Sequence, residues 1–82
     1  MNDGPVTEVV FPPLSKETPD AEGVLATWFV SEGARVTADQ LLAEVQVDKV
    51  SAEVVAPAAG VVHLLVEEEA TVRQGAAIAR IE

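Results

Sequence analysis

The pattern of apolar and polar residues is palindromic in the stretch Ala43-Glu44-Val45-Gln46-Val47-Asp48-Lys49-Val50-Ser51-Ala52-Glu53-Val54, with Asp48-Lys49 at its centre. On either side of Asp48-Lys49, apolar residues match apolar residues and polar residues match polar ones. The matched pairs are Val47 with Val50, Gln46 with Ser51, Val45 with Ala52, Glu44 with Glu53, and Ala43 with Val54. This alternation predicts a two-residue β-hairpin with one face toward a core and one toward water.

The residues at the centre of the palindromic pattern are unusual for such a turn. Two-residue hairpins prefer Asn-Gly or Asp-Gly, because their turns need positive φ at little cost. Lys49, at the second position of the turn, does not lower the cost of a positive φ as glycine does. A local rule broken without structural gain often marks a functional position. An exposed turn lysine without any function is the alternative interpretation.

Outside the hairpin the sequence is duplicated. The matched segments are 8–12 with 53–57, 23–25 with 60–62, and 30–45 with 66–81. Their order and phase agree, apart from one residue fewer between Gly60 and Val66 and a longer connection after Pro12. Two copies of one β-unit predict a small all-β sandwich or barrel with pseudo-two-fold symmetry, whose halves bury each other's apolar faces.

The duplication also predicts where the poles of the domain lie. The strand that leaves Lys49 ends at Pro57 at the opposite pole, so its counterpart ends at Pro12 at the Lys49 pole. The inserted loop Pro13 to Glu22 is therefore expected beside Lys49. By the same symmetry the two chain ends are expected together at the far pole.

Length and composition restrict the function. The chain has 82 residues, a net charge of −9 and no cysteine. It has room for one small domain but not for a large catalytic cleft, and thiol chemistry would need an attached group. The acidity disfavours nucleic acid or an anionic membrane as partner. With neither a long apolar run nor a signal pattern, a cytoplasmic protein is expected, or a matrix protein in a eukaryote.

Several segments resemble the lipoyl domains of dihydrolipoyl acyltransferases in 2-oxoacid dehydrogenase complexes. They are Gly23-Val24-Leu25, Val30-Ser31-Glu32-Gly33, Glu44 to Val50, and Glu53 to Gly60. The resemblance covers residues 6–82 and leaves residues 1–5 as a flexible N-terminus. It implies a flattened barrel, or barrel-sandwich hybrid, of two four-stranded antiparallel sheets.

The resemblance implies that lipoic acid is attached covalently to Lys49 and swings acyl groups and reducing equivalents between active sites. The domain itself would then have no catalytic residue. The implied partners are a thiamine-diphosphate-dependent 2-oxoacid decarboxylase, the acyltransferase core, dihydrolipoyl dehydrogenase and the lipoylating enzymes. The isolated domain is expected to be monomeric, and the resemblance does not single out one 2-oxoacid.

Residues around Lys49 acquire expected roles from the same resemblance. Asp48 and Val50 would be recognised by the lipoylating enzyme and the decarboxylase, although turn formation alone accounts equally well for Asp48. The loop acids Glu17, Asp20 and Glu22 would assist the choice of decarboxylase, or form only a solvated acidic surface.

Three positions depart from the family pattern. Glu69 replaces a glycine, the segment after Gly60 is one residue short, and Gln46-Val47 replaces a more common Glu-Thr. None of them is expected to affect the Lys49 turn.

Two further expectations concern structural residues. His63 lies between Val62 and Leu64 without acidic or thiol companions at ligand spacing, so a structural role is expected. Trp28, Phe29 and Phe11 are expected to anchor the core, as aromatics usually must in so small a domain.

Three other classes of protein remain open. A biotin carboxyl carrier also modifies a hairpin lysine, but that family places methionines beside it, whereas Asp48 and Val50 flank Lys49 here. A glycine-cleavage carrier resembles this fold but normally adds helices. An adaptor domain with an unmodified Lys49 is the third.

Overall fold

The computed structural model describes residues 6–18 and 20–82, so the expectation for residues 1–5 lies outside the described chain. All regular secondary structure in these residues is β-strand. The strands are β1 (Thr7–Val10), β2 (Glu22–Trp28), β3 (Arg35–Val36), β4 (Leu41–Val47), β5 (Val50–Val55), β6 (Gly60–Leu64), β7 (Thr71–Arg73) and β8 (Ala77–Ile81). The all-β prediction is confirmed.

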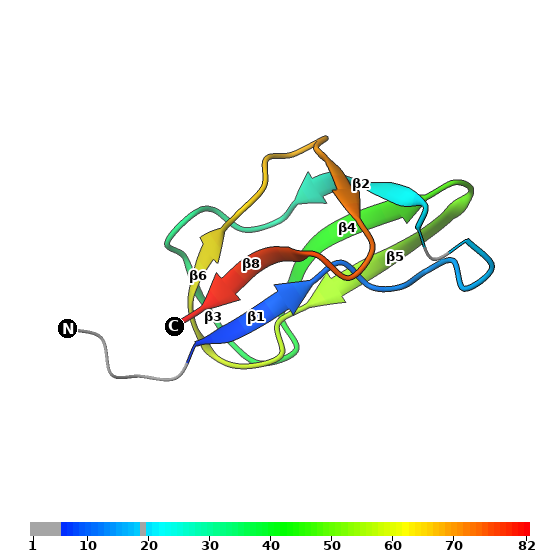
Figure 1. The fold of residues 1–82 in the computed structure, drawn as a ribbon. Coiled ribbons are helices and arrows are strands. Elements are labelled where there is room, and N and C mark those ends of the chain that lie inside the picture. The colour runs from blue at the N-terminus through cyan, green and yellow to red at the C-terminus, as the bar shows by residue number, and fades with distance from the viewer. Residues whose placement is uncertain (1–5, 19) are drawn as a thin grey trace.

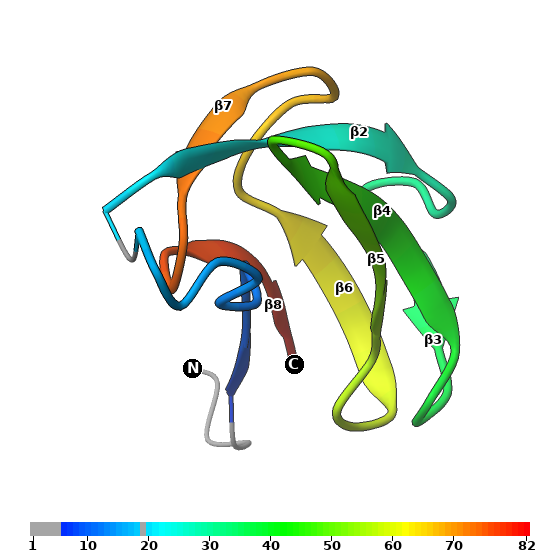
Figure 2. The ribbon, with the colours of Figure 1, turned by 90° about the vertical axis from the view of Figure 1, so that its right-hand side faces the viewer.

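The strands form two four-stranded antiparallel sheets, ordered β1-β8-β6-β3 and β5-β4-β2-β7 (Figures 1 and 2). Exchanging β1 to β4 with β5 to β8 converts one order into the other. This is the pseudo-two-fold symmetry that the duplication predicts. Each sheet therefore contains two strands of each repeat, and neither repeat can bury its apolar face alone.

Two equivalent side-chain hydrogen bonds, one in each repeat, obey the pseudo-two-fold symmetry. A Glu32 carboxylate oxygen accepts from the Leu64 backbone N–H at 2.6 Å. In the other half, a Glu68 carboxylate oxygen accepts from the Trp28 backbone N–H at 2.9 Å. Each acid tethers its loop to the end of a strand from the opposite repeat, which explains why a glutamate recurs at both positions.

The one-residue difference between the repeats is a β-bulge in β2. Pairing of β2 with β4 shifts between Leu25 and Thr27, whereas β6 pairs with β8 from Val62 to Leu64 without a shift. Ala26 is therefore an extra residue in the first repeat, and the second repeat has the regular strand. A bulge absorbs an insertion in this way without disturbing the flanking register.

The core lies between the sheets, and only one of the three aromatic side chains is fully buried in it. Phe11 is 0% exposed. Trp28 is partly buried, and its indole N–H donates to the Val66 carbonyl at 3.1 Å. The expectation for Phe29 is wrong, because its side chain is 51% exposed. Consecutive residues in an extended chain point to opposite sides, so Trp28 and Phe29 cannot both face inward.

The departure at Glu69 has a consequence for stability. Its counterpart in the first repeat, Gly33, has φ of 82°, and Glu69 itself has φ of 71°. A non-glycine residue in the left-handed region costs roughly 1–2 kcal/mol. We predict that Glu69→Gly raises the melting temperature by about 4 °C, since about 1 kcal/mol shifts a domain of this size by 4–8 °C.

Two variants control that measurement by thermal unfolding. Glu69→Gln removes the charge but keeps the strained backbone, so its melting temperature should change little. Gly33→Ala should lower it, because no atom crowds that position and only the backbone conformation penalises a side chain. A lower melting temperature for Glu69→Gly would contradict the explanation.

Candidate functional site

The hairpin around Asp48-Lys49 has the register that the sequence predicts. All five predicted pairs, from Val47 with Val50 to Ala43 with Val54, are observed between β4 and β5. Strand β4 also pairs with β2 on its other side, so the turn extends from an interior strand of the sheet. Val45 and Val47 are buried below the turn, which fixes the hairpin to the core.

Backbone strain in the turn falls on Asp48 rather than on Lys49. Asp48 has φ of 55°, whereas Lys49 is not among the residues with positive φ. Aspartate tolerates this region better than most residues, because its short polar side chain can bond locally. The expectation that Lys49 occupies the unfavourable place is wrong, and Asp48 has a turn-forming role at the least.

Gln46 acts on the same turn. Its side-chain amide N–H donates to the backbone carbonyl of Asp48 at 3.1 Å. That carbonyl belongs to the peptide that joins Asp48 to Lys49. The expectation that the Gln46-Val47 departure does not affect the turn is therefore wrong. An amide can donate this hydrogen bond and an ionised glutamate cannot. The replacement of glutamate by Gln46 was therefore the feature of the sequence that could have indicated this contact.

The Lys49 side chain is accessible. It is exposed, and within residues 6–18 and 20–82 no hydrogen bond or ion pair engages its ammonium group. The adjacent Val50 is 50% exposed although it pairs with the buried Val47. Asp48, Lys49 and Val50 thus form a small exposed tip on a rigid base, as a residue that is modified by an enzyme requires.

Gly23 lets strand β2 pass close to this hairpin. A Cβ atom at this position would overlap the Phe11 ring and lie 2.7 Å from the Gln46 carbonyl oxygen. Three segments consequently pack together: the base of the hairpin, the start of β2 and the start of the β1–β2 loop. A side chain at Gly23 would separate them.

The β1–β2 loop lies at the same pole as the Lys49 turn, as the duplication predicts (Figures 1 and 2). Glu17, Asp20 and Glu22 are exposed there. In the described part of the chain no hydrogen bond joins the loop to Asp48 or Lys49. Ser15, Thr18 and Ala21 of the loop are instead bonded to the side chain of Gln74 in the β7–β8 turn. At the opposite pole Thr7 pairs with Ile81, so the two ends of the domain lie side by side.

His63 has acidic companions that its sequence neighbours do not reveal. Its Nδ1 lies 2.7 Å from a Glu32 carboxylate oxygen and its Nε2 lies 2.9 Å from a Glu82 carboxylate oxygen. Arg80 is its cross-strand partner. These acids do not stand at ligand spacing in the sequence, and the sheets bring them to His63 from remote positions. The group lies near the C-terminal end of β8, away from Lys49, which suits the expected structural role.

These contacts shift two pKa values in opposite directions. The hydrogen bond that His63 donates to Glu32, with a smaller contribution from the one that it donates to Glu82, outweighs desolvation and raises the pKa of His63 above its ordinary 6.5. The Leu64 N–H, followed by His63, lowers the pKa of Glu32 below its ordinary 4.5. The His63 contribution to stability is complete below pH 6.5 and disappears as the pH rises through the raised pKa. The Glu32 contribution is complete above pH 4.5 and disappears as the pH falls through the lowered pKa.

We predict that the difference in unfolding free energy between the protein and its His63→Gln variant is largest near pH 5.5 and shrinks toward pH 8. Urea unfolding at a series of pH values measures it. His63 is the only histidine, so its imidazole resonances report its pKa directly. A midpoint at or below 6.5 would contradict the assignment.

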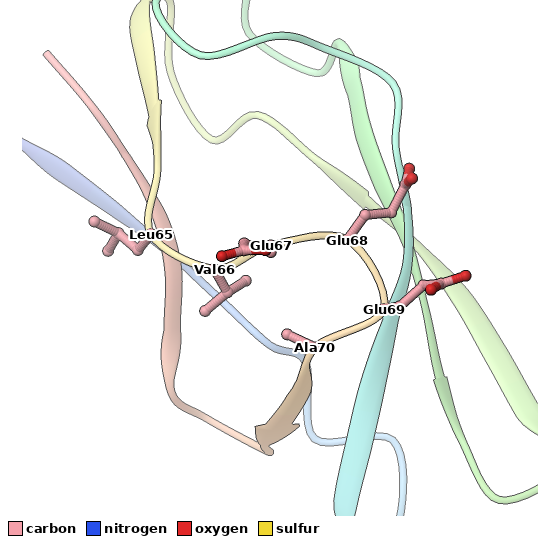
Figure 3. A pocket seen from close by; sticks show the side chains of 6 residues that line it. All are labelled: Leu65, Val66, Glu67, Glu68, Glu69 and Ala70. Atoms are coloured by element: carbon pink, nitrogen blue, oxygen red, sulfur yellow. The ribbon is translucent and has the colours of Figure 1, made fainter.

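A shallow hollow of about 380 Å³ lies on the β6–β7 loop. Figure 3 shows that one short segment, Leu65 to Ala70, lines it, and that the Glu68 and Glu69 carboxylates point away from it. In Figure 1 this loop is separate from the β4–β5 turn. The hollow is therefore not part of the Lys49 site.

The described residues contain neither a metal site nor a membrane-spanning helix. No cluster of three or more His, Cys, Asp or Glu side chains could hold a metal ion there. In the same residues, no helix has the length and apolarity needed to span a membrane.

A small two-sheet domain that presents an exposed lysine at a hairpin tip is the architecture of a carrier for a covalently attached cofactor. Comparison with known families agrees. The family described as "Biotin-requiring enzyme" matches residues 6–81. The lipoyl domain of the 2-oxoglutarate dehydrogenase complex from Azotobacter vinelandii superimposes with a TM-score of 0.74 and 31% identity, over 93% of this chain and 96% of that one.

Three curated relatives are acyltransferase components. The acetyltransferase component of the pyruvate dehydrogenase complex from Corynebacterium glutamicum is 40% identical over 95% of this chain and 11% of its own length. The corresponding Mycobacterium tuberculosis component is 38% identical, over 95% of this chain and 14% of its length. The succinyltransferase component of the 2-oxoglutarate dehydrogenase complex from Cupriavidus necator is 36% identical, over 94% and 18%.

The chain belongs to the biotinyl- and lipoyl-attachment family, and within it to the lipoyl domains. Lipoyl domains of this family carry lipoic acid on a lysine and are not themselves catalytic. The chain spans less than a fifth of the length of the curated relatives described above.

Proposed function

We propose that Lys49 is the attachment point for lipoic acid and that the domain carries acyl groups between the active sites of a 2-oxoacid dehydrogenase complex. The observation that carries the proposal is the exposed Lys49, free of hydrogen bonds and ion pairs in the described chain, at the tip of the β4–β5 hairpin. The membership in the lipoyl domains supports it.

The residues present fit a lipoyl group. Attachment joins the Lys49 amine to the lipoyl carboxyl group as an amide, so the charge of the lysine is lost. Because no ion pair in the described residues depends on that charge, the domain loses no contact on modification. Held on Lys49, the group would supply a dithiolane, whose chemistry is the uptake and release of an acyl group together with two reducing equivalents.

The protein contributes position rather than catalysis. The buried Val45 and Val47 hold the hairpin rigid, and the hydrogen bond from Gln46 fixes the peptide that precedes Lys49. The paired residues Thr7 and Ile81 lie at the opposite pole, so chain that leads away from them does not obstruct the tip. A tethered carrier raises the effective concentration of its substrate at each site that it can reach.

The proposed partners follow from this role. They are the thiamine-diphosphate-dependent decarboxylase, the acyltransferase core, dihydrolipoyl dehydrogenase and a lipoylating enzyme. Asp48 and Val50 are proposed as recognition residues because both flank Lys49 and are exposed. The acids Glu17, Asp20 and Glu22 at the same pole suit a decarboxylase with a basic rim. The domain acts as a monomer in the cytoplasm, or in the matrix of a eukaryote.

Reductive acylation tests the proposal. The lipoylated domain is incubated with the pyruvate or the 2-oxoglutarate decarboxylase component of a bacterial complex and the matching 2-oxoacid, and free lipoamide serves as the control substrate. One component should acylate the domain with a much higher kcat/KM than free lipoamide. Equal values for domain and lipoamide would show that the protein surface is not recognised.

A further inference from the structure

Gln74 connects two parts of the chain that are remote in sequence. Its side-chain carbonyl oxygen accepts from the Ser15 backbone N–H at 2.8 Å. Its amide nitrogen donates to the carbonyls of Thr18 at 3.2 Å and Ala21 at 2.9 Å. One partly buried side chain thus bonds backbone groups of Ser15, Thr18 and Ala21 in the β1–β2 loop, as acceptor for the first and donor to the other two.

This arrangement breaks the pseudo-two-fold symmetry. The backbone bonds that join the β7–β8 turn to the end of β1, from Phe11 N–H to the Ala76 carbonyl and from Gly75 N–H to the Phe11 carbonyl, recur in the other half. There, Ala56 and Asp39 donate to the Gln40 and Ala56 carbonyls.

The side-chain bonds do not recur. Ala38 occupies the position equivalent to Gln74 and has no group that could form them. The connection after Pro57 is also short there, with only Ala58 and Ala59 before β6. The glutamine is present only in the half that contains the long loop.

The bonds leave the outer side chains of the loop available. Lys16, Glu17 and Asp20 are exposed, whereas Leu14 packs against the core. The Ser15 and Thr18 hydroxyls, 2.6 Å apart, close the loop internally. The loop, which lies at the Lys49 pole (Figure 1), therefore has an inner side held by Gln74 and a charged outer side.

We propose that Gln74 is a positioning residue for recognition by the decarboxylase, because it holds the β1–β2 loop in the conformation that the decarboxylase binds. The inference rests on the proposed function. A loop held in its binding conformation does not have to be ordered on binding, and apparent affinity falls in proportion to the fraction of molecules in the competent state. The bonds of Gln74 to Ser15, Thr18 and Ala21 belong to the β1–β2 loop and not to the Lys49 turn, so lipoylation should not depend on them.

The test compares Gln74→Leu with Gln40→Leu, both fully lipoylated. Gln40 is a matched glutamine in the β3–β4 turn at the far pole, where it accepts from the Thr37 N–H. For Gln74→Leu we expect faster hydrogen exchange of the Ser15 amide, an unchanged rate of lipoylation, and a KM for reductive acylation raised on the order of tenfold at unchanged kcat. Gln40→Leu should change neither exchange at Ser15 nor KM.

Gln74→Glu is a second variant of nearly the same shape. It can still accept from Ser15 but cannot donate to the Thr18 and Ala21 carbonyls when ionised, so its KM should also rise. The inference is overturned if exchange at Ser15 is unchanged in Gln74→Leu, or if exchange accelerates while KM stays the same. If the wild-type domain accepts no acyl group from either decarboxylase, the proposed function fails and the inference with it.

Discussion

Lys49→Arg is expected to reduce lipoylation to background while the domain stays folded. Arginine keeps the positive charge and the length of the side chain, but its guanidinium does not form the amide. Lys49 is exposed and has no partner among the described residues, so the melting temperature should move little. The measurement is incorporation of lipoate by lipoate ligase and ATP, followed by intact mass.

Lys16→Arg is the matched control, because Lys16 is the only other lysine and is also exposed. It should be modified at the wild-type rate. Incorporation into Lys49→Arg at the wild-type rate would show that Lys49 is not the site.

Exchanging the two turn residues, by Asp48→Lys with Lys49→Asp, is expected to prevent nearly all modification. The exchange conserves composition and charge but moves the amine by one position. Neighbouring residues in extended chain direct their side chains differently, and a lysine at position 48 would have to adopt the positive φ that Asp48 now adopts. An enzyme that reads the tip should find the amine misplaced.

Asp48→Asn separates geometry from charge in the same assay. Asparagine tolerates positive φ as aspartate does, so this variant should keep the turn and lose only the carboxylate. Slower lipoylation of Asp48→Asn would assign Asp48 a recognition role in addition to its turn-forming role. If the exchanged protein were modified as fast as wild type, recognition would not depend on the position of the amine.

The parts of the fold that rest on repeated patterns could be predicted from the sequence. The register of the hairpin follows from the palindromic pattern about Asp48-Lys49, since a slip of one residue would turn its apolar side chains to water. The symmetry and the pole that holds the β1–β2 loop follow from the duplication. Such predictions succeed because the polarity of many residues is compatible with only one arrangement of the strands.

The missed features depend on single side chains that meet across the sheets. His63 bonds Glu32 and Glu82, and Gln74 bonds the β1–β2 loop, through contacts that no local pattern encodes. The strain at Asp48 and the outward direction of Phe29 are set by the local backbone conformation. A repeat pattern does not determine either.

Whether Lys49 carries lipoic acid in the cell is decided by its mass. The protein is isolated from the cell that makes it, under conditions where the 2-oxoacid dehydrogenase complexes are active, and the peptide that contains Lys49 is analysed. We expect the mass of one lipoyl amide, located on Lys49 by fragmentation. A biotinyl group at Lys49, or an unmodified Lys49 while other lipoyl proteins of the same cell are modified, would contradict it.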